Sequence, residues 1–344
     1  MNELDINNPQ LPDFIVPGAD EKKQDEPAKI KVIGVGGGGG NAVNHMYHQG
    51  IGGVSFVLCN TDAQALRNSP VPVKVQLGAK GEGAGNIPEV AKKLAEESAA
   101  EVEALFDDNT RMAFITAGMG GGTGTGAAPV VARIAKEKGV LTVGIVTIPF
   151  LFEGEPKILQ AFAGVEEMRK HVDALLVINN ERLCKIYPDL SWTTAFAKAD
   201  DSLSNAARSI AELVSKDGKI NLDFADVRTT LKDGGAAVIS TGSGEGEHRM
   251  SRAIQNALTS PLLKESDIYG AERVLFNLYF SPEEGDELRM QESKELSEFM
   301  LRFKKKVNVI WGYTHDSSLG KAVKITILAT GFEVSDLTFK GEYG

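Results

Sequence analysis

The sequence predicts an α/β protein with a Rossmann-like parallel-sheet domain, a long central helix and a second α+β domain. The first observation is an alternation, over residues 30–192, of short β-branched runs with segments of helical spacing. The second is a long amphipathic stretch at 193–216, and the third is a change of pattern after it, including two adjacent strands joined by a short turn. Alternating strands and helices predict parallel pairing, whereas the later pattern predicts an α+β arrangement.

Composition separates an N-terminal arm from the folded part of the chain. With 344 residues, 42% hydrophobic and 24% charged, the chain is long enough for two ordinary domains and is globular in composition. Residues 1–29 differ, because they hold four prolines and seven acidic residues against three lysines, without sustained periodicity. We therefore expect a disordered acidic arm at 1–29 and a fold that begins at Lys29 or Ile30.

The first domain, 30–192, is predicted from six apolar strands with helices between them. The strand-like runs lie at 29–36, 54–61, 73–78, 111–118, 141–149 and 173–180. One helical segment is "IPEVAKKLAEESAAEVEALF" at 87–106. Strands that are apolar throughout and joined by helices imply a parallel sheet covered on both faces. Ligands of such sheets bind at the carboxyl ends of the strands, where two glycine loops fall.

The central helix, 193–216, is predicted from one apolar stripe at steps of three and four residues. Its members are Phe196, Ala199, Leu203, Ala206, Ile210 and Leu213. We expect this helix to bridge the two halves of the protein.

The second domain, 217–332, is predicted from four strands and two helical segments. The strands lie at 236–244, 272–280, 307–314 and 322–332, and the helical segments lie near 247–259 and 292–305. Because only "HDSSLG" joins the last two strands, we expect them to pair antiparallel. The core is expected to end near Phe332, with a short tail at 333–344.

The first glycine segment, "GVGGGG" at 34–39, allows an alternative. It satisfies G-x-G-x-x-G, follows a strand, precedes a helix and has Asp62 after the second strand, so an NAD-binding Rossmann domain must be considered. Three features argue against an NAD-binding domain. Asp62 lies about eight positions further from the glycines than the ribose-binding acidic residue of such a domain. The five consecutive glycines exceed what a dinucleotide turn requires, and an NAD-binding domain does not explain the second glycine loop. A P-loop NTPase is disfavoured, because no glycine is followed by Lys and then Ser or Thr.

The second glycine segment, "GMGGGTGTG" at 118–126, predicts the main phosphate site. Six glycines in nine positions let backbone N–H groups point at an anion, while Thr123 and Thr125 can add hydroxyl donors. A helix expected from about Gly126 would aim its positive N-terminus at the same phosphates. A tight turn or hinge would need only one or two glycines. A third glycine-rich segment, "GAKGEGAGNIPE" at 78–89, could close over a terminal phosphate.

Charge, cysteines and histidines narrow the function classes. A formal charge of −10 argues against a nucleic-acid partner. Cys59 and Cys184 form no CxxC pattern, so we expect neither a disulfide framework nor a zinc site. His45 and His48 lack a third metal ligand, so we expect them to be groove or surface residues. The sequence contains no run of 18 or more apolar residues, which a membrane-spanning helix would need, so we expect the protein in the cytoplasm.

Several motifs, in order, resemble one family. "GGGTGTG" at 120–126 resembles the signature of the tubulin and FtsZ superfamily, and "NLDFADVR" at 221–228 resembles the FtsZ catalytic loop. The likeness runs from Lys29 to Phe332 and includes "VGGGGGNAV", "NTDAQAL", "FEG" and "SPLL". It implies a tubulin/FtsZ-like fold whose first domain binds GTP or GDP with Mg²⁺. It also implies a polymerising GTPase of the bacterial division ring at mid-cell, with head-to-tail protofilaments and other division proteins as partners.

The resemblance also implies which residues hold the nucleotide. They are Gly36, Gly37, Gly38, Gly39, Asn41, Asn60, Gly85, Gly118, Gly120, Gly121, Gly122, Thr123, Gly124, Thr125, Gly126, Thr147, Pro149, Glu153, Lys157, Asn180, Phe196 and Asp201. Within this set, Asp201 would accept from the two adjacent N–H donors of guanine, Phe196 would stack on the base, and Asn180 would assist. Without the resemblance, the residues alone favour a solvated Asp201 and a Phe196 that is plain core. No metal ligand is assigned.

The catalytic loop has two interpretations. Asp223 and Asp226 stand three apart at a predicted loop-to-helix boundary, so Asp223 could simply be an N-cap. The bridging helix, however, carries the loop about 36 Å from the glycine loops. The resemblance implies that Asp223 and Asp226, with Asn221, enter the nucleotide pocket of a neighbouring subunit, position a water and make hydrolysis depend on assembly.

Two departures from the family pattern are visible. The family has Arg three places after the glycine of "FEG", whereas this chain has Lys157, which keeps the charge but loses the planar fork. No flexible linker or tether-binding peptide follows Gly344, so coupling to a membrane through that peptide is not expected. An NAD-dependent oxidoreductase and a nucleotide-binding filament with little hydrolysis remain the alternative functions.

Overall fold

The computed structural model describes residues 29–189, 191–215, 222–259, 268–283, 285–303 and 306–332. The predicted acidic arm apart from Lys29, the "SPLL" segment at 260–263 and the predicted tail at 333–344 lie outside the described residues. Among the described helices, none combines the length and the apolar character that a membrane span requires.

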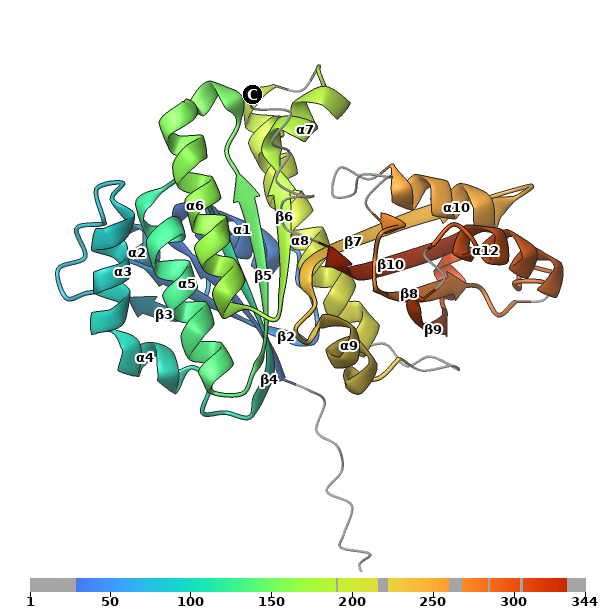
Figure 1. Ribbon diagram of the computed structural model, residues 1–344, viewed down its shortest axis with the longest axis horizontal. Coiled ribbons are helices and arrows are strands. Elements are labelled where there is room, and N and C mark those ends of the chain that lie inside the picture. The colour runs from blue at the N-terminus through green and yellow to red at the C-terminus, as the bar shows by residue number, and fades with distance from the viewer. Residues whose placement is uncertain are drawn as a thin grey trace, which may run out of the picture.

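One ten-stranded sheet runs through both halves of the molecule, in the order β3-β2-β1-β4-β5-β6-β7-β10-β8-β9 (Figure 1). The first six strands are all parallel, as predicted. They are β1 (Lys29–Val35), β2 (Val54–Asn60), β3 (Val73–Gln76), β4 (Thr110–Gly118), β5 (Leu141–Ile148) and β6 (Ala174–Asn179). Their carboxyl ends therefore meet at one edge.

The remaining four strands form a mixed sheet that continues the first. They are β7 (Gly235–Gly244), β8 (Arg273–Phe280), β9 (Asn308–His315) and β10 (Val323–Phe332). β7 pairs with β6 in parallel only through Ala174–Gly235 and Leu175–Ala236. β10 pairs antiparallel with both β7 and β8, and β9 pairs parallel with β8. The two halves of the sheet are thus joined by a short ladder.

Two buried cores lie on opposite faces of the sheet. One core includes residues of α3 (Pro88–Glu97), α5 (Gly122–Glu137), α6 (Glu155–His171), α10 (Arg249–Leu258) and α12 (Ser293–Met300). The other includes residues of α1 (Gly36–His48), α8 (Trp192–Ser215) and α9 (Phe224–Leu231). Helices cover both faces because the strands are apolar on both sides, which confirms the predicted doubly covered sheet.

The central helix α8 links the two ends of the molecule. It begins beside α7 (Asn180–Ile186) and ends beside α9, at the opposite end of the parallel sheet (Figure 1). Five of the six predicted stripe residues are buried, whereas the side chain of Phe196 is 44% exposed. The stripe therefore packs as predicted except at its first residue, so Phe196 is not plain core.

Three details of the predicted elements are wrong. The helix expected at 87–106 is broken at Ser98, whose buried Oγ accepts a hydrogen bond from Gly78 N at 2.9 Å, and a separate α4 (Ala99–Ala104) follows. Helix α5 begins at Gly122, four residues before the expected Gly126. The strands expected to pair across "HDSSLG" are β9 and β10, but β8 lies between them.

Candidate functional site

The two glycine loops lie side by side at the carboxyl edge of the sheet. The first leads from β1 into α1 and the second from β4 into α5, and β1 and β4 are neighbours. Gly36 has φ +73°, and a Cβ there would lie 2.8 Å from Gly124 N and 3.1 Å from Thr123 Cβ. Two helix N-termini with unpaired N–H groups are therefore held together, which is a suitable arrangement for binding an anion.

Two further segments close on the second loop. A Cβ added to Gly122 would lie 2.8 Å from the backbone nitrogen of Ile87, in the third glycine segment. A Cβ added to Gly120, which has φ +96°, would lie 2.8 Å from Lys157 O and from Pro149 Cγ. The second glycine loop, the third glycine segment and the segment that holds Pro149 and Lys157 thus come from separate elements that meet at one place.

The glycines predicted to bind nucleotide differ in what surrounds them. A Cβ would crowd neighbouring backbone within 3.4 Å at most of them: Gly36, Gly38, Gly39, Gly120, Gly122, Gly124 and Gly126. A Cβ at Gly118 would make only ordinary contact, at 3.6 Å. At Gly37, Gly85 and Gly121 it would meet nothing within 4 Å. Most of these glycines therefore let the loops pack together, whereas Gly37, Gly85 and Gly121 adjoin open space where a ligand fits.

Threonine side chains brace the loops. Thr125 Oγ1 accepts from Gly120 N at 2.9 Å, and Thr123 Oγ1 lies 2.7 Å from the hydroxyl of Thr61. Thr125 lies in the first turn of α5, so its oxygen stabilises the loop that leads into the helix. Thr61 was not predicted, although its place directly after β2 and Asn60, at the carboxyl edge, is a signal that could have found it.

The other predicted polar residues lie around the same edge. Asn41 is exposed in the first turns of α1, and Asn60 Oδ1 accepts from Asp62 N at 3.2 Å. The buried Thr147 lies at the end of β5, and its carbonyl accepts from Met119 N at 2.9 Å. Asp62 Oδ1 accepts from Gln64 N and Ala65 N at 2.8 and 3.2 Å, which makes it the N-cap of α2 (Ala63–Arg67). Helix capping therefore explains an acidic residue at position 62, and a contact with the ribose of a dinucleotide is not needed to explain it.

Glu153 and Lys157 form a pair next to the second loop. The Lys157 ammonium lies 2.5 Å from Glu153 Oε2, and Glu153 Oε1 accepts from Phe150 N at 2.9 Å. Gln160, one turn further along α6, donates to Gly120 O at 2.9 Å. Gln160 was not predicted, because its role depends on how α6 packs against α5. Lys157 therefore has a carboxylate partner in this chain.

The predicted base residues lie at the start of α7 and along α8. The Phe196 ring lies edge-on to those of Phe150 and Phe152, with centroids 5.1 and 6.5 Å away. Asn180 is 7% exposed, and its Oδ1 has no hydrogen-bond partner among the described residues. A buried amide oxygen without a donor is costly, so a ligand N–H would stabilise it.

Asp201 is contacted by His45, for which the sequence predicts only a groove or surface position. His45 Nε2 on α1 lies 2.7 Å from Asp201 Oδ1, and Lys198 Nζ lies 3.8 Å from Asp201 Oδ2. Burial raises the pKa of the neighbouring Asp200 carboxyl to about 6, although the charge of His45 acts to lower this pKa. Asp201 is therefore held in place by α1, the helix that begins at the first glycine loop.

The predicted catalytic pair lies at the start of α9, near the far end of α8 (Figure 1). Asp223 Oδ1 accepts from Asp226 N at 2.9 Å, and Asp226 Oδ2 accepts from Asp223 N at 3.1 Å. This is a capping box, so the N-cap interpretation of Asp223 is confirmed. The reciprocal bonds engage one oxygen of each carboxylate. Asn221 lies outside the described residues.

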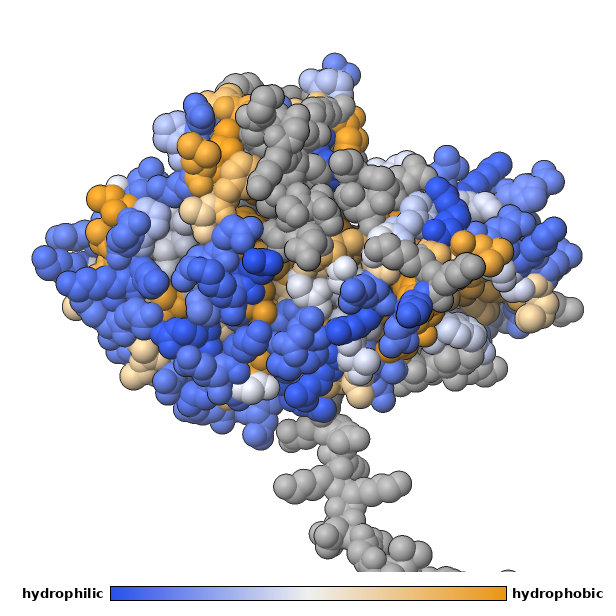
Figure 2. All heavy atoms as spheres, in the orientation of Figure 1, coloured by the Kyte–Doolittle hydropathy of each residue, from blue (hydrophilic) through white to orange (hydrophobic). Residues whose placement is uncertain are grey.

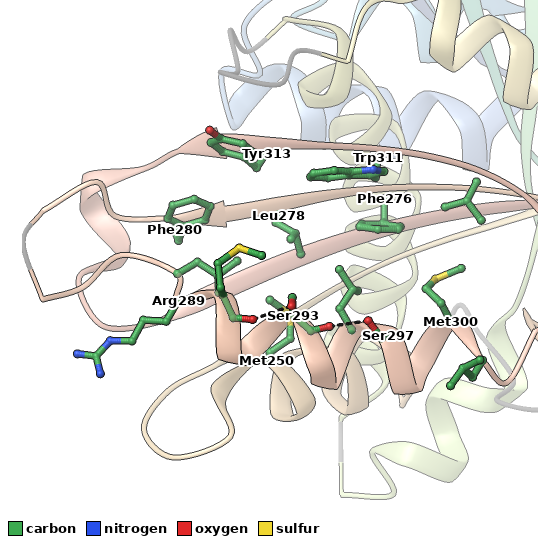
Figure 3. Close-up of a pocket in the computed structure, with 15 residues that line it drawn as sticks. Met250, Phe276, Leu278, Phe280, Arg289, Ser293, Ser297, Met300, Trp311 and Tyr313 are labelled. Carbon is green, nitrogen blue, oxygen red and sulfur yellow. Dashed lines mark hydrogen bonds between the residues drawn. The ribbon is translucent and has the colours of Figure 1, made fainter.

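An apolar cavity lies elsewhere, in the second half of the molecule. About 970 Å³ in volume, it lies between α12 and strands β8 and β9, where Phe276, Trp311 and Tyr313 line it (Figure 3). Its apolar lining does not suit a phosphate. Among residues 29–332 as far as they are described, no three His, Cys, Asp or Glu side chains gather where they could hold a metal ion.

Comparisons with known proteins agree over both halves of the chain. A family model described as "Tubulin/FtsZ family, GTPase domain" matches residues 29–188, and one described as "FtsZ family, C-terminal domain" matches residues 235–333. The chain is 62% identical to "Cell division protein FtsZ" of Porphyromonas gingivalis (strain ATCC BAA-308 / W83), over 90% of this chain and 68% of that protein. It is 44% identical to the protein of the same name from Wigglesworthia glossinidia brevipalpis, over 88% of this chain and 79% of that protein.

Comparison with solved structures points to the same family. The chain described as "FtsZ dimer, empty (M. jannaschii)" superposes with a TM-score of 0.79 and 40% identity, covering 90% of this chain and 89% of that one. With these matches, the NAD-dependent oxidoreductase is set aside. The chain belongs to the tubulin/FtsZ family, and it is a GTPase and a GTP-dependent cytoskeletal protein of cell division.

Proposed function

We propose that this chain assembles head to tail into protofilaments and hydrolyses GTP at a site shared between neighbouring subunits. One observation carries the proposal. The glycine loops lie at one end of α8 and the acidic pair Asp223 and Asp226 lies at the other, and a helix of 24 residues spans about 36 Å. Two carboxylates so far away serve a pocket only if it belongs to the next subunit.

The phosphates would bind at the paired N-termini of α1 and α5. The space beside Gly37, Gly85 and Gly121 supports this, since a Cβ there would meet nothing within 4 Å. Magnesium would be held here mainly by phosphate oxygens and water, which is how this ion commonly binds beside a nucleotide. Lys157 and Glu153 would border the phosphates.

Guanine would lie against Phe196, with Asp201 and Asn180 at its polar edge. We expect Asp201→Asn to lower the preference for GTP over ITP at least about tenfold, because a carboxylate accepts from the guanine 2-amino group more strongly than an amide does. Competition binding of GTP and ITP to the variant and to the natural chain measures this. Unchanged discrimination in the Asp201→Asn variant would refute the base assignment.

The exposed end of the molecule supports contact with a second subunit. Leu151, Phe152 and Leu159 are between 42% and 59% exposed near the predicted pocket. Figure 2 shows apolar side chains gathered over the upper end of α6. Because such a patch buries favourably against a partner, it supports a heterologous, head-to-tail interface that does not close. We further propose a cytoplasmic ring at mid-cell, with other division proteins as partners.

Phosphate release measured across protein concentrations, with Mg²⁺ and GTP present and pelleting followed in parallel, tests the shared site. We expect specific activity near zero at low concentration and a rise as polymer forms. Activity per molecule that stays flat would show that each chain hydrolyses GTP alone. Polymer without phosphate release would instead favour a filament with little hydrolysis.

A further inference from the structure

A buried carboxylate ties the predicted catalytic helix to the nucleotide-binding half. Asp173 lies between α6 and β6, and its side chain is 0% exposed. Its Oδ2 accepts from Thr142 N at 2.9 Å, while its Oδ1 lies 2.8 Å from Lys232 Nζ and 3.5 Å from Lys136 Nζ. A carboxylate is buried at this depth only when donors and cations compensate it, and here three do.

The two lysines come from different helices. Lys136 lies in the last turn of α5, the helix that begins at the second glycine loop, and it also donates to Val172 O at 2.9 Å. Lys232 is the C-cap of α9, the helix that begins at the capping box of Asp223 and Asp226. One carboxylate therefore contacts the ends of both helices, and each helix carries one half of the proposed active site at its other end.

The backbone of Asp173 makes the same connection. Its carbonyl accepts from Gly234 N at 2.8 Å and from Gly235 N at 3.2 Å, directly after α9. At the other end of α9, the Arg111 guanidinium of β4 lies 4.3 Å from the centre of the Phe224 ring. Helix α9 is thus fixed to the parallel sheet at both ends. Its 8 residues span about 12 Å, so a displacement at Lys232 is transmitted to Asp223 and Asp226.

We propose that Asp173 and Lys232 are positioning residues, which hold α9 against the nucleotide-binding half so that Asp223 and Asp226 reach the neighbouring pocket in the right place. The inference rests on the shared active site proposed above. Neither residue touches the nucleotide, and both act through the placement of α9. Small errors in the placement of reacting groups cost large factors in rate, whereas binding of GTP at the far end does not depend on α9.

A matched pair of variants tests the proposal. Lys232→Gln and Lys136→Gln each remove one ammonium partner of the same carboxylate, and the two lysine side chains are 44% and 31% exposed. We expect Lys232→Gln to lower kcat per polymerised subunit about tenfold, with the KM for GTP and the pelleted fraction unchanged. Lys136→Gln should stay within about twofold of the natural chain. Lys232→Arg, which keeps the charge, should recover most of the activity.

The results of these variants distinguish a failure of the positioning role from a failure of the proposed shared active site. Equal losses in Lys232→Gln and Lys136→Gln, in step with a lower melting temperature, would show that Asp173 matters only for stability and would overturn the proposal. Natural activity in Lys232→Gln, beside an inactive Asp226→Ala, would overturn it as well while leaving the shared site intact. Natural activity in Asp226→Ala would instead refute the shared site itself.

Discussion

Asp226→Ala is expected to release phosphate at least about a hundredfold more slowly than the natural chain while its affinity for GTP stays nearly unchanged. The physical reason is distance, since Asp226 lies in the first turn of α9, whereas the glycine loops lie at the other end of α8. The measurement is phosphate release from polymer, beside GTP binding to the unassembled chain. Loss of binding instead would contradict the assignment of Asp226 to a neighbour's pocket.

A mixing experiment distinguishes a shared site from a site within one chain. Asp226→Ala keeps its own pocket, and a variant with a disabled pocket, such as Gly124→Ala, keeps its own Asp226. When the two variants assemble together, the intact pocket of Asp226→Ala can meet the intact Asp226 of the other variant. The mixture should therefore release phosphate, although neither variant does so alone. If the pair co-pellets and remains inactive, each chain must supply both halves for itself.

The capping box requires a control for stability. Asp226→Ala also removes the acceptor of Asp223 N, and loss of such a cap costs about 1 kcal/mol. Asp226→Asn keeps an oxygen acceptor at the same place but loses the charge. We expect Asp226→Asn to melt close to the natural chain and still release phosphate slowly, which would assign the effect to chemistry and not to unfolding of α9.

Alanine at two glycines of the second loop is expected to give opposite patterns of stability and binding. A Cβ at Gly124 would overlap the Gly118 carbonyl, so Gly124→Ala should lower the free energy of unfolding by about 1 to 3 kcal/mol and abolish GTP binding. A Cβ at Gly121 would meet nothing within 4 Å. Gly121→Ala should therefore keep the stability and lower GTP affinity about tenfold, because the added methyl group occupies the proposed phosphate position.

Thermal melting without nucleotide and GTP binding by calorimetry measure the two effects. Gly40→Ala is a matched control, because Gly40 lies in α1, is assigned no contact with nucleotide, and would place its Cβ in open space. Alanine there should raise stability by about 0.5 to 1 kcal/mol, since glycine is a poor helix former, and should leave affinity unchanged. A Gly121→Ala variant that bound GTP as well as the Gly40→Ala control would place the phosphates elsewhere.

Local sequence patterns were sufficient for the parallel sheet and for the ends of several helices. The six apolar runs became six parallel strands, and the spacing of Asp223 and Asp226 was enough to place the N-cap of α9. These features depend on residues that are close in the chain. The break at Ser98 was missed because it depends on Gly78, twenty positions away, whose N–H competes for the serine oxygen.

Long-range packing explains what the sequence alone did not predict. His45 looked like a groove or surface residue, since nothing near it in the chain indicates that α8 brings Asp201 within 2.7 Å. The glycines were interpreted mainly as a means of exposing N–H groups to phosphate, but at Gly36, Gly38 and Gly122 the crowded neighbours are backbone atoms of other loops. The pairing of β8 with β10 likewise follows from tertiary packing, which the short "HDSSLG" connection does not reveal.

The separation of the two half-sites by the length of α8 fixes how many working sites a filament contains. An open chain of n subunits has n − 1 junctions, and on the proposed arrangement each junction makes one active site. One terminal subunit then holds a nucleotide that no neighbour attacks, and the opposite terminal subunit holds an acidic pair with no pocket to enter. A dimer would turn over at half the per-subunit rate of a long filament, so fragmentation alone would slow GTP consumption and leave intact nucleotide at one end only.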